Sequence, residues 1–272
     1  MKDLSKIDYR SLDRPEILMF LFHPRQEWGG SGGEGLYEEV LVPVEHNAVV
    51  GGRLYWSGRE SPSILFFHGN GEIVADYEDL APQYAQIGIN FMPMDYRGYG
   101  RSTGRPTITS MMRDCHVIFD YVQTMLRERR HGGPLIVMGR SLGSASALEL
   151  VYGYGNRIDG LIIESGFAYA EPLLHLLGID MKALGITEAE GFRNVDKIRS
   201  FDKPTLIIHA ENDHIIPLSD GQALYQACPA EEKRLLIIAG AHHNDIFLQG
   251  MATYLEAVRE LADRSAAARR GW

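Results

Sequence analysis

Residues 134–144 read Pro-Leu-Ile-Val-Met-Gly-Arg-Ser-Leu-Gly-Ser, and this stretch decides the fold. An apolar run ends in Gly139-Arg-Ser-Leu-Gly143, and small residues that suit a helix follow it. A strand, a sharp turn and a helix in this order are what a G-x-S-x-G nucleophile elbow requires. A Cβ at either glycine would collide with the neighbouring strand or helix. The motif therefore predicts that Ser141 lies in a strained turn with its Oγ exposed.

Short apolar strands alternate with helices on both sides of this stretch. Besides the run before Gly139, the expected strands are residues 37–44, 49–56, 63–67, 89–94, 159–163, 203–209 and 233–238. The expected helices are residues 73–87, 110–130, 145–154, 219–227 and 245–264. The first two strands are expected to form an antiparallel hairpin. The alternation predicts an α/β fold with a mainly parallel sheet that helices cover on both faces.

Two regions depart from the alternation. Residues 1–36 are expected to be an N-terminal extension to the main domain, which is residues 37–272. The glycine-rich part of this extension, residues 28–35, is expected to be a flexible loop. Residues 167–200 are helical by pattern and lie between two core strands. Ligands bind at the carboxyl ends of the strands in an open sheet, so we interpret this insertion as a lid. The alternative is an ordinary crossover helix with a long loop.

Composition excludes several classes of function. The 272 residues carry a net charge of −9 at pH 7, whereas a nucleic-acid partner requires a basic surface. The two cysteines, Cys115 and Cys228, fit neither a metal-ligand spacing nor a disulfide framework. We therefore expect no nucleic-acid partner, no metal site and a reducing, cytoplasmic location.

The apolar run Ile17-Leu-Met-Phe-Leu-Phe22 is too short to span a bilayer and lies in the wrong place for a secretory signal. No integral membrane segment is therefore expected. The simplest prediction is a short helix docked on the body of the protein. The alternative is a peripheral membrane contact through Ile17–Phe22.

A serine hydroxyl is a poor nucleophile at neutral pH, so Ser141 needs an imidazole as general base and a carboxylate that orients the imidazole. The chain order expected for this kind of fold is serine, acid, histidine. Asp213 follows the strand at residues 203–209, where a carboxylate points toward the crevice rather than the core. Glu211 and Glu164 are the competing candidates for the acid.

The candidate base lies in Ile238-Ala-Gly-Ala-His-His-Asn-Asp245, after the last strand. Only one of the two adjacent histidines, His242 or His243, can point from this loop toward Ser141. The local sequence pattern alone does not decide which of the two is the base. The developing oxyanion needs backbone N–H donors. We assign Leu142, at the start of a helix, and Asn70, in the loop His68-Gly-Asn-Gly71, as the oxyanion hole.

With these residues in place, residues 37–265 resemble the α/β-hydrolase superfamily. The resemblance rests on His68–Gly71, Asp95-Tyr-Arg-Gly-Tyr-Gly-Arg-Ser102, the elbow, the Asp213 loop and Gly240-Ala-His-His-Asn-Asp245. It implies an eight-stranded, mostly parallel sheet with a small helical lid. It looks closest to the branch of alpha/beta-hydrolase domain-containing proteins, with esterase, thioesterase and serine-aminopeptidase-like relatives. The Gly-x-x-His-Asn-Asp pattern of that branch implies that His243 is the base.

The expected function is that of a cofactor-free serine hydrolase with the triad Ser141, Asp213 and His243. Its substrate is expected to be a small-molecule carboxylic ester or thioester. The alternatives are a peptidase or amidase acting on small substrates, and a binding module of the same fold that has lost its chemistry. Arg140 has two open roles, since it either braces the elbow or reaches toward the substrate.

Overall fold

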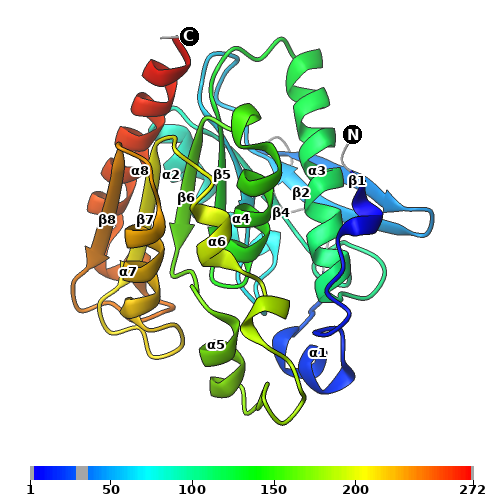
Figure 1. Ribbon diagram of the computed structural model, residues 1–272. Helices are drawn as coiled ribbons and strands as arrows, with labels where there is room; N and C mark the ends of the chain where they lie inside the picture. The colour runs from blue at the N-terminus through cyan, green and yellow to red at the C-terminus, as the bar shows by residue number, and fades with distance from the viewer. Residues whose placement is uncertain (1–2, 29–35, 271–272) are drawn as a thin grey trace.

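The computed structural model describes residues 3–28 and 36–270 of the chain. Its centre is an eight-stranded sheet with the order β1-β2-β4-β3-β5-β6-β7-β8 (Figure 1). The strands are β1 (Glu38–Glu45), β2 (Ala48–Leu54), β3 (Ser63–Phe67), β4 (Asn90–Met94), β5 (Leu135–Arg140), β6 (Gly160–Glu164), β7 (Thr205–Ala210) and β8 (Lys233–Ile238). β2 is antiparallel to both of its neighbours, and β3 to β8 are parallel. The predicted mostly parallel α/β sheet is confirmed.

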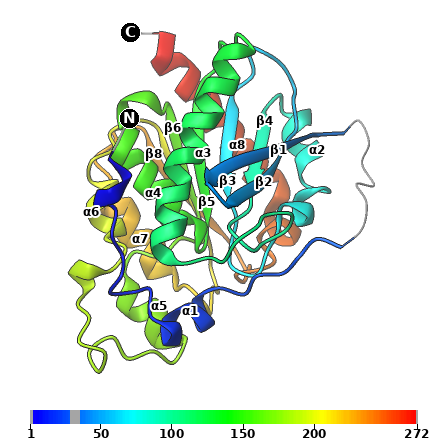
Figure 2. The ribbon, with the colours of Figure 1, turned by 90° about the vertical axis from the view of Figure 1, so that its right-hand side faces the viewer.

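Helices lie on both faces of this sheet, as Figures 1 and 2 show. They are α1 (Pro15–Leu21), α2 (Ala81–Gln86), α3 (Ile108–Glu128), α4 (Gly143–Tyr154), α5 (Ala170–Leu176), α6 (Asn194–Ile198), α7 (Leu218–Ala227) and α8 (Ile246–Arg270). Side chains of a strand alternate between the two faces. In β5, Val137 joins the core under α3 and α4, whereas Ile136 and Met138 join the core under α2 and α8. Two covered faces explain why β3 to β7 are buried at every position and are mostly apolar.

The chain between β3 and β4 does not form the single helix predicted over residues 73–87. It forms a 3₁₀ turn, Val74–Tyr77, followed by the short helix α2. Pro82 lies in the first turn of α2, where no N–H donor is needed, whereas a continuous helix would bury it in the helix interior. The N–H of Val74 donates to Asp95 at 3.0 Å, which ties this connection to the end of β4.

The N-terminal residues pack against the body. α1 is the expected short helix, with Ile17 and Leu21 buried and Met19 and Phe20 exposed. None of the helices within residues 3–28 and 36–270 combines the length and the apolarity that crossing a bilayer demands. Peripheral membrane contact through Ile17–Phe22 stays a prediction. Residues 29–35 of the predicted glycine-rich loop lie outside the described residues.

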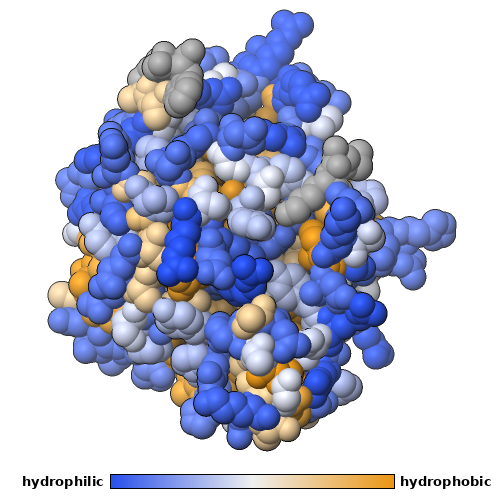
Figure 3. All heavy atoms as spheres, viewed as in Figure 1, coloured by the Kyte–Doolittle hydropathy of each residue, from blue (hydrophilic) through white to orange (hydrophobic). Residues whose placement is uncertain are grey.

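The connection from β6 to β7 has two parts. α5 and the chain that follows it lie beyond the carboxyl ends of the strands, at the bottom of Figure 1. Their buried side chains include Leu174, Met181 and Phe192. Most of the face in Figure 3 is hydrophilic, with small apolar areas, one of them toward this lower end. α6, in contrast, packs against α4 as an ordinary crossover helix does. The end of the predicted lid therefore belongs to the body.

Replacing Gly143 with alanine is expected to destabilise the fold, because a Cβ there would lie 2.1 Å from the carbonyl oxygen of Phe67 in β3. Overpacking against fixed backbone costs about 1–3 kcal/mol or more of the free energy of unfolding. Urea unfolding measures the change. Gly155→Ala is the matched control, since its Cβ would meet only Phe201 at an ordinary 3.5 Å and its φ is −50°. Equal stability of Gly143→Ala and Gly155→Ala would contradict the close approach.

Candidate active site

Ser141 occupies the turn between β5 and α4. Its φ of 50° lies in the left-handed region, which residues with a Cβ rarely adopt. The Ser141 N–H donates to the Glu164 carbonyl at 2.9 Å, and the Ser144 N–H donates to the Ser141 carbonyl at 3.0 Å. These bonds hold the strained turn between β6 and the first turn of α4, and the Ser141 side chain remains partly accessible.

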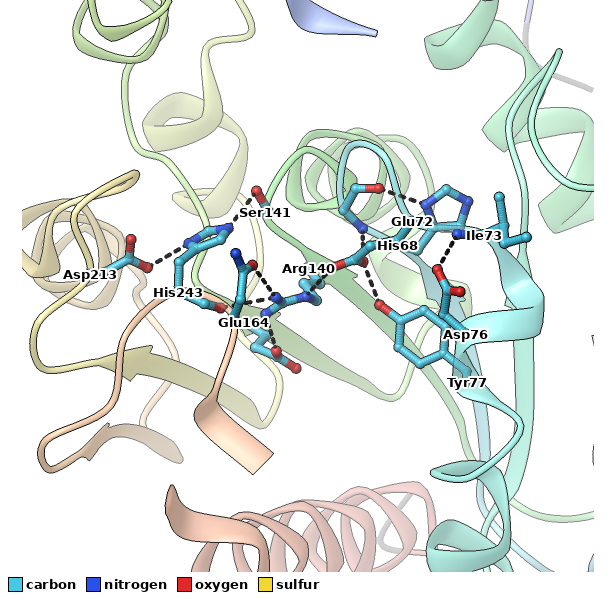
Figure 4. Close-up of polar contacts among 12 residues, drawn as sticks. His68, Glu72, Ile73, Asp76, Tyr77, Arg140, Ser141, Glu164, Asp213 and His243 are labelled. Carbon is cyan, nitrogen blue, oxygen red and sulfur yellow. Dashed lines mark hydrogen bonds and ion pairs between the residues drawn. The ribbon is translucent and has the colours of Figure 1, made fainter. Parts of the chain in front are cut away.

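The structure brings Ser141, His243 and Asp213 together (Figure 4). His243 Nε2 lies 3.1 Å from Ser141 Oγ, and His243 Nδ1 lies 2.7 Å from Asp213 Oδ2. The residues follow the carboxyl ends of β5, β8 and β7, respectively. Parallel strands present these ends at one edge of the sheet, so residues far apart in the chain meet there.

Asp213 is held as a carboxylate by its loop. Its Oδ1 accepts the N–H groups of Ile215 and Ile216 at 3.0 and 2.8 Å. Burial acts to raise the pKa of Asp213, but the hydrogen bond from His243 and those from the backbone lower it below its ordinary value. An ionised Asp213 keeps the proton of His243 on Nδ1 and leaves Nε2 facing Ser141 as an acceptor.

The two competing acids have other partners. Glu211 accepts the N–H of Gly240 at 2.8 Å. Glu164 accepts hydrogen bonds from Arg140 and Tyr254, both at 2.6 Å. Neither carboxylate contacts His243, so Asp213 is the acid that the geometry offers to this histidine.

His242 points away from the site. It is exposed, its Nδ1 lies 2.9 Å from the carbonyl oxygen of Asn212, and its ring lies against that of His214. His243 is buried and lies between Ser141 and Asp213. Successive side chains of the loop leave in different directions, which separates two histidines that the local sequence pattern does not.

The two candidate oxyanion donors belong to the elbow and to the loop after β3. Leu142 directly precedes α4, and Asn70 lies in the loop after β3. Within the described parts of the chain, no acceptor takes the N–H of Leu142 or of Asn70. His68 Nδ1 lies 2.7 Å from the Gly69 carbonyl oxygen and so fixes the peptide plane that carries the Asn70 N–H. Both donors are therefore available to a substrate oxygen.

A segment of the N-terminal extension, His23–Gln26, runs along this loop and is called the strap here. The N–H of His23 donates to Asn70 Oδ1 at 2.9 Å, and His23 Nδ1 lies 2.8 Å from Asn70 Nδ2. Arg25 Nε donates to the Gly71 carbonyl at 2.8 Å. The extension thus contacts the site, which the sequence pattern did not indicate.

Arg140 is the main feature of the site that the sequence pattern left open. Its guanidinium is buried and donates to Glu72 at 2.8 Å, to Glu164 at 2.6 Å and to the His243 carbonyl at 2.9 Å (Figure 4). Burial acts to lower the pKa of Arg140, but Glu72 and Glu164 hold it well above its ordinary value. All three guanidinium nitrogens of Arg140 are thus taken by groups of the protein around the elbow, which favours the bracing role over a reach toward the substrate.

Glu72 was not identified from the sequence. Its Oε2 accepts the N–H of Gly69 at 2.7 Å and the hydroxyl of Tyr77 at 2.6 Å. Burial acts to raise the pKa of Glu72, but the charge of Arg140 and the hydrogen bonds from Tyr77 and Arg140 lower it to about 2. The only signal for this pair in the sequence was an arginine inside the elbow motif, because a buried arginine requires carboxylate partners.

No group of three or more histidine, cysteine, aspartate or glutamate side chains in residues 3–28 and 36–270 is arranged to hold a metal ion.

The chain is similar in sequence to known α/β-hydrolases. The family model described as Serine aminopeptidase, S33 matches residues 58–187. Alpha/beta hydrolase domain-containing protein 17B of Homo sapiens is 31% identical over 210 residues, which are 74% of this chain and 66% of that protein. Protein 17C of Mus musculus is 31% identical over 205 residues, which are 73% of this chain and 58% of that protein. The chain thus covers less than two thirds of the length of these relatives.

Solved structures share the fold. An esterase of Pyrococcus furiosus superposes with a TM-score of 0.72 and 18% identity, covering 90% of this chain and 98% of the esterase. Est1E of Butyrivibrio proteoclasticus, with ferulic acid bound, gives a TM-score of 0.69 and 18% identity, covering 84% of this chain and 99% of Est1E. At this level of identity the likeness speaks for the fold alone.

Proposed function

Because this chain belongs to the α/β-hydrolase superfamily, we propose that it is a serine hydrolase that cleaves a carboxylic ester or thioester. The observation that carries the proposal is the continuous series of hydrogen bonds from Asp213 through His243 to Ser141. The three residues occur in the order serine, acid, histidine, which is the order in α/β-hydrolases with this chemistry.

In the proposed reaction, Ser141 Oγ attacks the acyl carbonyl carbon while His243 Nε2 takes the hydroxyl proton. Asp213 stabilises the imidazolium that forms, and the tetrahedral intermediate collapses when His243 returns the proton to the leaving group. The acyl group stays on Ser141 as an ester. A water molecule, deprotonated by His243, then attacks this ester. The bond from the acyl carbon to Ser141 Oγ breaks as His243 returns the proton to Oγ, which releases the carboxylic acid and restores the enzyme.

The N–H groups of Asn70 and Leu142 are proposed to bind the oxyanion of both tetrahedral intermediates. The position of Leu142 at the start of α4 adds the favourable field of the helix N-terminus. Removal of one such donor typically lowers kcat by about 10²–10³-fold. Because both donors belong to the backbone, their effectiveness depends on how firmly the two loops are held.

The second candidate function is that of a peptidase or amidase on small substrates, and the match to the S33 serine aminopeptidase model favours it. The chemistry of attack is the same for both functions. They differ at the leaving group, since an amine is a poorer leaving group than an alkoxide or a thiolate and depends more strongly on the proton that His243 delivers.

The purified protein is expected to hydrolyse p-nitrophenyl acetate, p-nitrophenyl butyrate and a butyryl thioester with higher kcat/KM than an aminoacyl p-nitroanilide. Release of nitrophenol, free thiol or nitroaniline measures the rates, and the Ser141→Ala protein supplies the background. Faster cleavage of the anilide would select the peptidase. Failure to cleave any of these substrates, together with no labelling by a fluorophosphonate, would indicate a binding module.

A further inference from the structure

We propose that Arg140 is a positioning residue that holds the oxyanion loop, residues 68–72, and the histidine loop, residues 240–245, in fixed geometry around Ser141. This inference rests on the proposed function, because positioning matters only if these loops carry the oxyanion donor and the base. Arg140 itself contacts neither the Ser141 hydroxyl nor the ring of His243.

Arg140 is anchored at the elbow, since it ends β5 and directly precedes Ser141. Its side chain is only 7% exposed, and all three guanidinium nitrogens have partners. One of these partner residues, Glu164, ends the neighbouring strand β6 and also accepts a hydrogen bond from the hydroxyl of Tyr254 at 2.6 Å. The sheet therefore holds the guanidinium in place independently of its contacts with the two loops.

Toward the oxyanion loop, Arg140 acts through Glu72. Arg140 Nε donates to Glu72 Oε1 at 2.8 Å, and Glu72 Oε2 accepts the N–H of Gly69 at 2.7 Å. Gly69 directly precedes Asn70, whose N–H is a proposed oxyanion donor. The chain of contacts thus fixes the backbone next to this donor relative to the nucleophile.

Toward the histidine loop, Arg140 acts on the backbone of the base. Nη2 donates to the His243 carbonyl at 2.9 Å and lies 3.3 Å from Asn244 Oδ1. The bond to Asp213 fixes the ring of His243, whereas the bond to Arg140 fixes its main chain. A planar guanidinium can donate to Glu72, Glu164 and the His243 carbonyl at the same time. The side chain of lysine is shorter and ends in a single ammonium group, which cannot make all three contacts together.

Arg140→Lys keeps the charge and removes the simultaneous contacts, so kcat for p-nitrophenyl butyrate is expected to fall by about 10²-fold, as for a small misplacement of catalytic groups. KM should change little. Arg53→Lys is the matched control, because Arg53 is also buried between two carboxylates, Glu27 and Glu78, but lies outside this network. Rates are expressed per folded protein, measured by circular dichroism. Wild-type kcat in Arg140→Lys would overturn the proposal.

A second readout does not depend on turnover. The proton on His243 Nδ1, bonded to Asp213, should give a downfield proton resonance that is absent from His243→Ala. Arg140→Lys should shift or broaden this resonance, and Arg53→Lys should not. If the wild-type protein cleaves no ester, the proposed function fails while the resonance still tests the link from Arg140 to His243. An unchanged resonance in folded Arg140→Lys would exclude that link.

If Arg140→Lys does not fold, Glu72→Gln tests the oxyanion branch by itself. This substitution removes the negative charge of the side chain that links Arg140 to the N–H of Gly69, but it leaves the hydrogen bond from Arg140 to the His243 carbonyl. The expected result is a lower kcat with an unchanged His243 resonance. An unchanged kcat would show that the oxyanion loop is held without Arg140.

Discussion

Replacing Ser141 with alanine is expected to abolish ester hydrolysis, with a loss of kcat on the order of 10⁶-fold, as seen when a triad serine is removed. The substitution deletes the Oγ that lies 3.1 Å from His243 Nε2, so no acyl-enzyme forms. Any rate of the variant that remains above the uncatalysed reaction in water would come from the oxyanion donors and from substrate binding alone. Fluorophosphonate labelling, which requires the same hydroxyl, should disappear with it.

The protein should stay folded, because the substitution removes one atom from a partly accessible side chain. Circular dichroism and thermal unfolding verify this. Ser146→Ala is the control, since this serine is buried in α4 and its hydroxyl has no hydrogen-bond partner in the described structure. It should keep both hydrolysis and labelling. Persistent activity in Ser141→Ala would remove the proposed mechanism.

Replacing His243 with alanine is expected to lower kcat by a factor of similar size, on the order of 10⁶, because a triad serine and its histidine act as a unit. Replacing its neighbour His242 should change kcat little. The two residues differ in geometry rather than in type, since His243 lies between Ser141 and Asp213 and His242 is exposed against Asn212. Steady-state rates of both variants with p-nitrophenyl butyrate make the comparison.

The two histidine variants control for each other, because both change the same loop. A rate for His242→Ala far below that of His243→Ala would reassign the base. Equal, large losses in both would indicate that the loop tolerates no alanine, and His243→Gln, which preserves size, would then replace His243→Ala in the comparison.

The fold and the placement of the site followed from local sequence patterns. Apolar runs of strand length are visible without any partner, and the sharp turn at Gly139–Gly143 needs its two glycines wherever it occurs. Ser141, Asp213 and the pair His242 and His243 could be placed because each follows a strand, and parallel strands bring their carboxyl ends to one edge. The choice of His243 within the pair came only from the resemblance to α/β-hydrolases. Once the strands were recognised, the meeting of these residues followed from topology.

Other features depended on contacts that no local pattern encodes. The 3₁₀ turn Val74–Tyr77 begins where the N–H of Val74 donates to Asp95, just after β4, and this long-range contact is not visible in the local pattern. The partners of Arg140 lie in three separate loops or strand ends, and each distance depends on how the whole sheet is assembled. The direction of His242 likewise depends on where the chain at Asn212 lies.

The strap has a practical consequence for making the protein. A boundary drawn from the sequence pattern separates residues 1–36 from the main domain, and a shortened protein starting at residue 37 would keep all three residues of the triad. It would nevertheless lose His23, which holds the side chain of Asn70, and Arg25, which holds the carbonyl of Gly71. Such a shortened protein would also lack the core side chains Leu12, Ile17 and Leu21, so it would be a misleading standard for catalytic rate even though its nucleophile is intact.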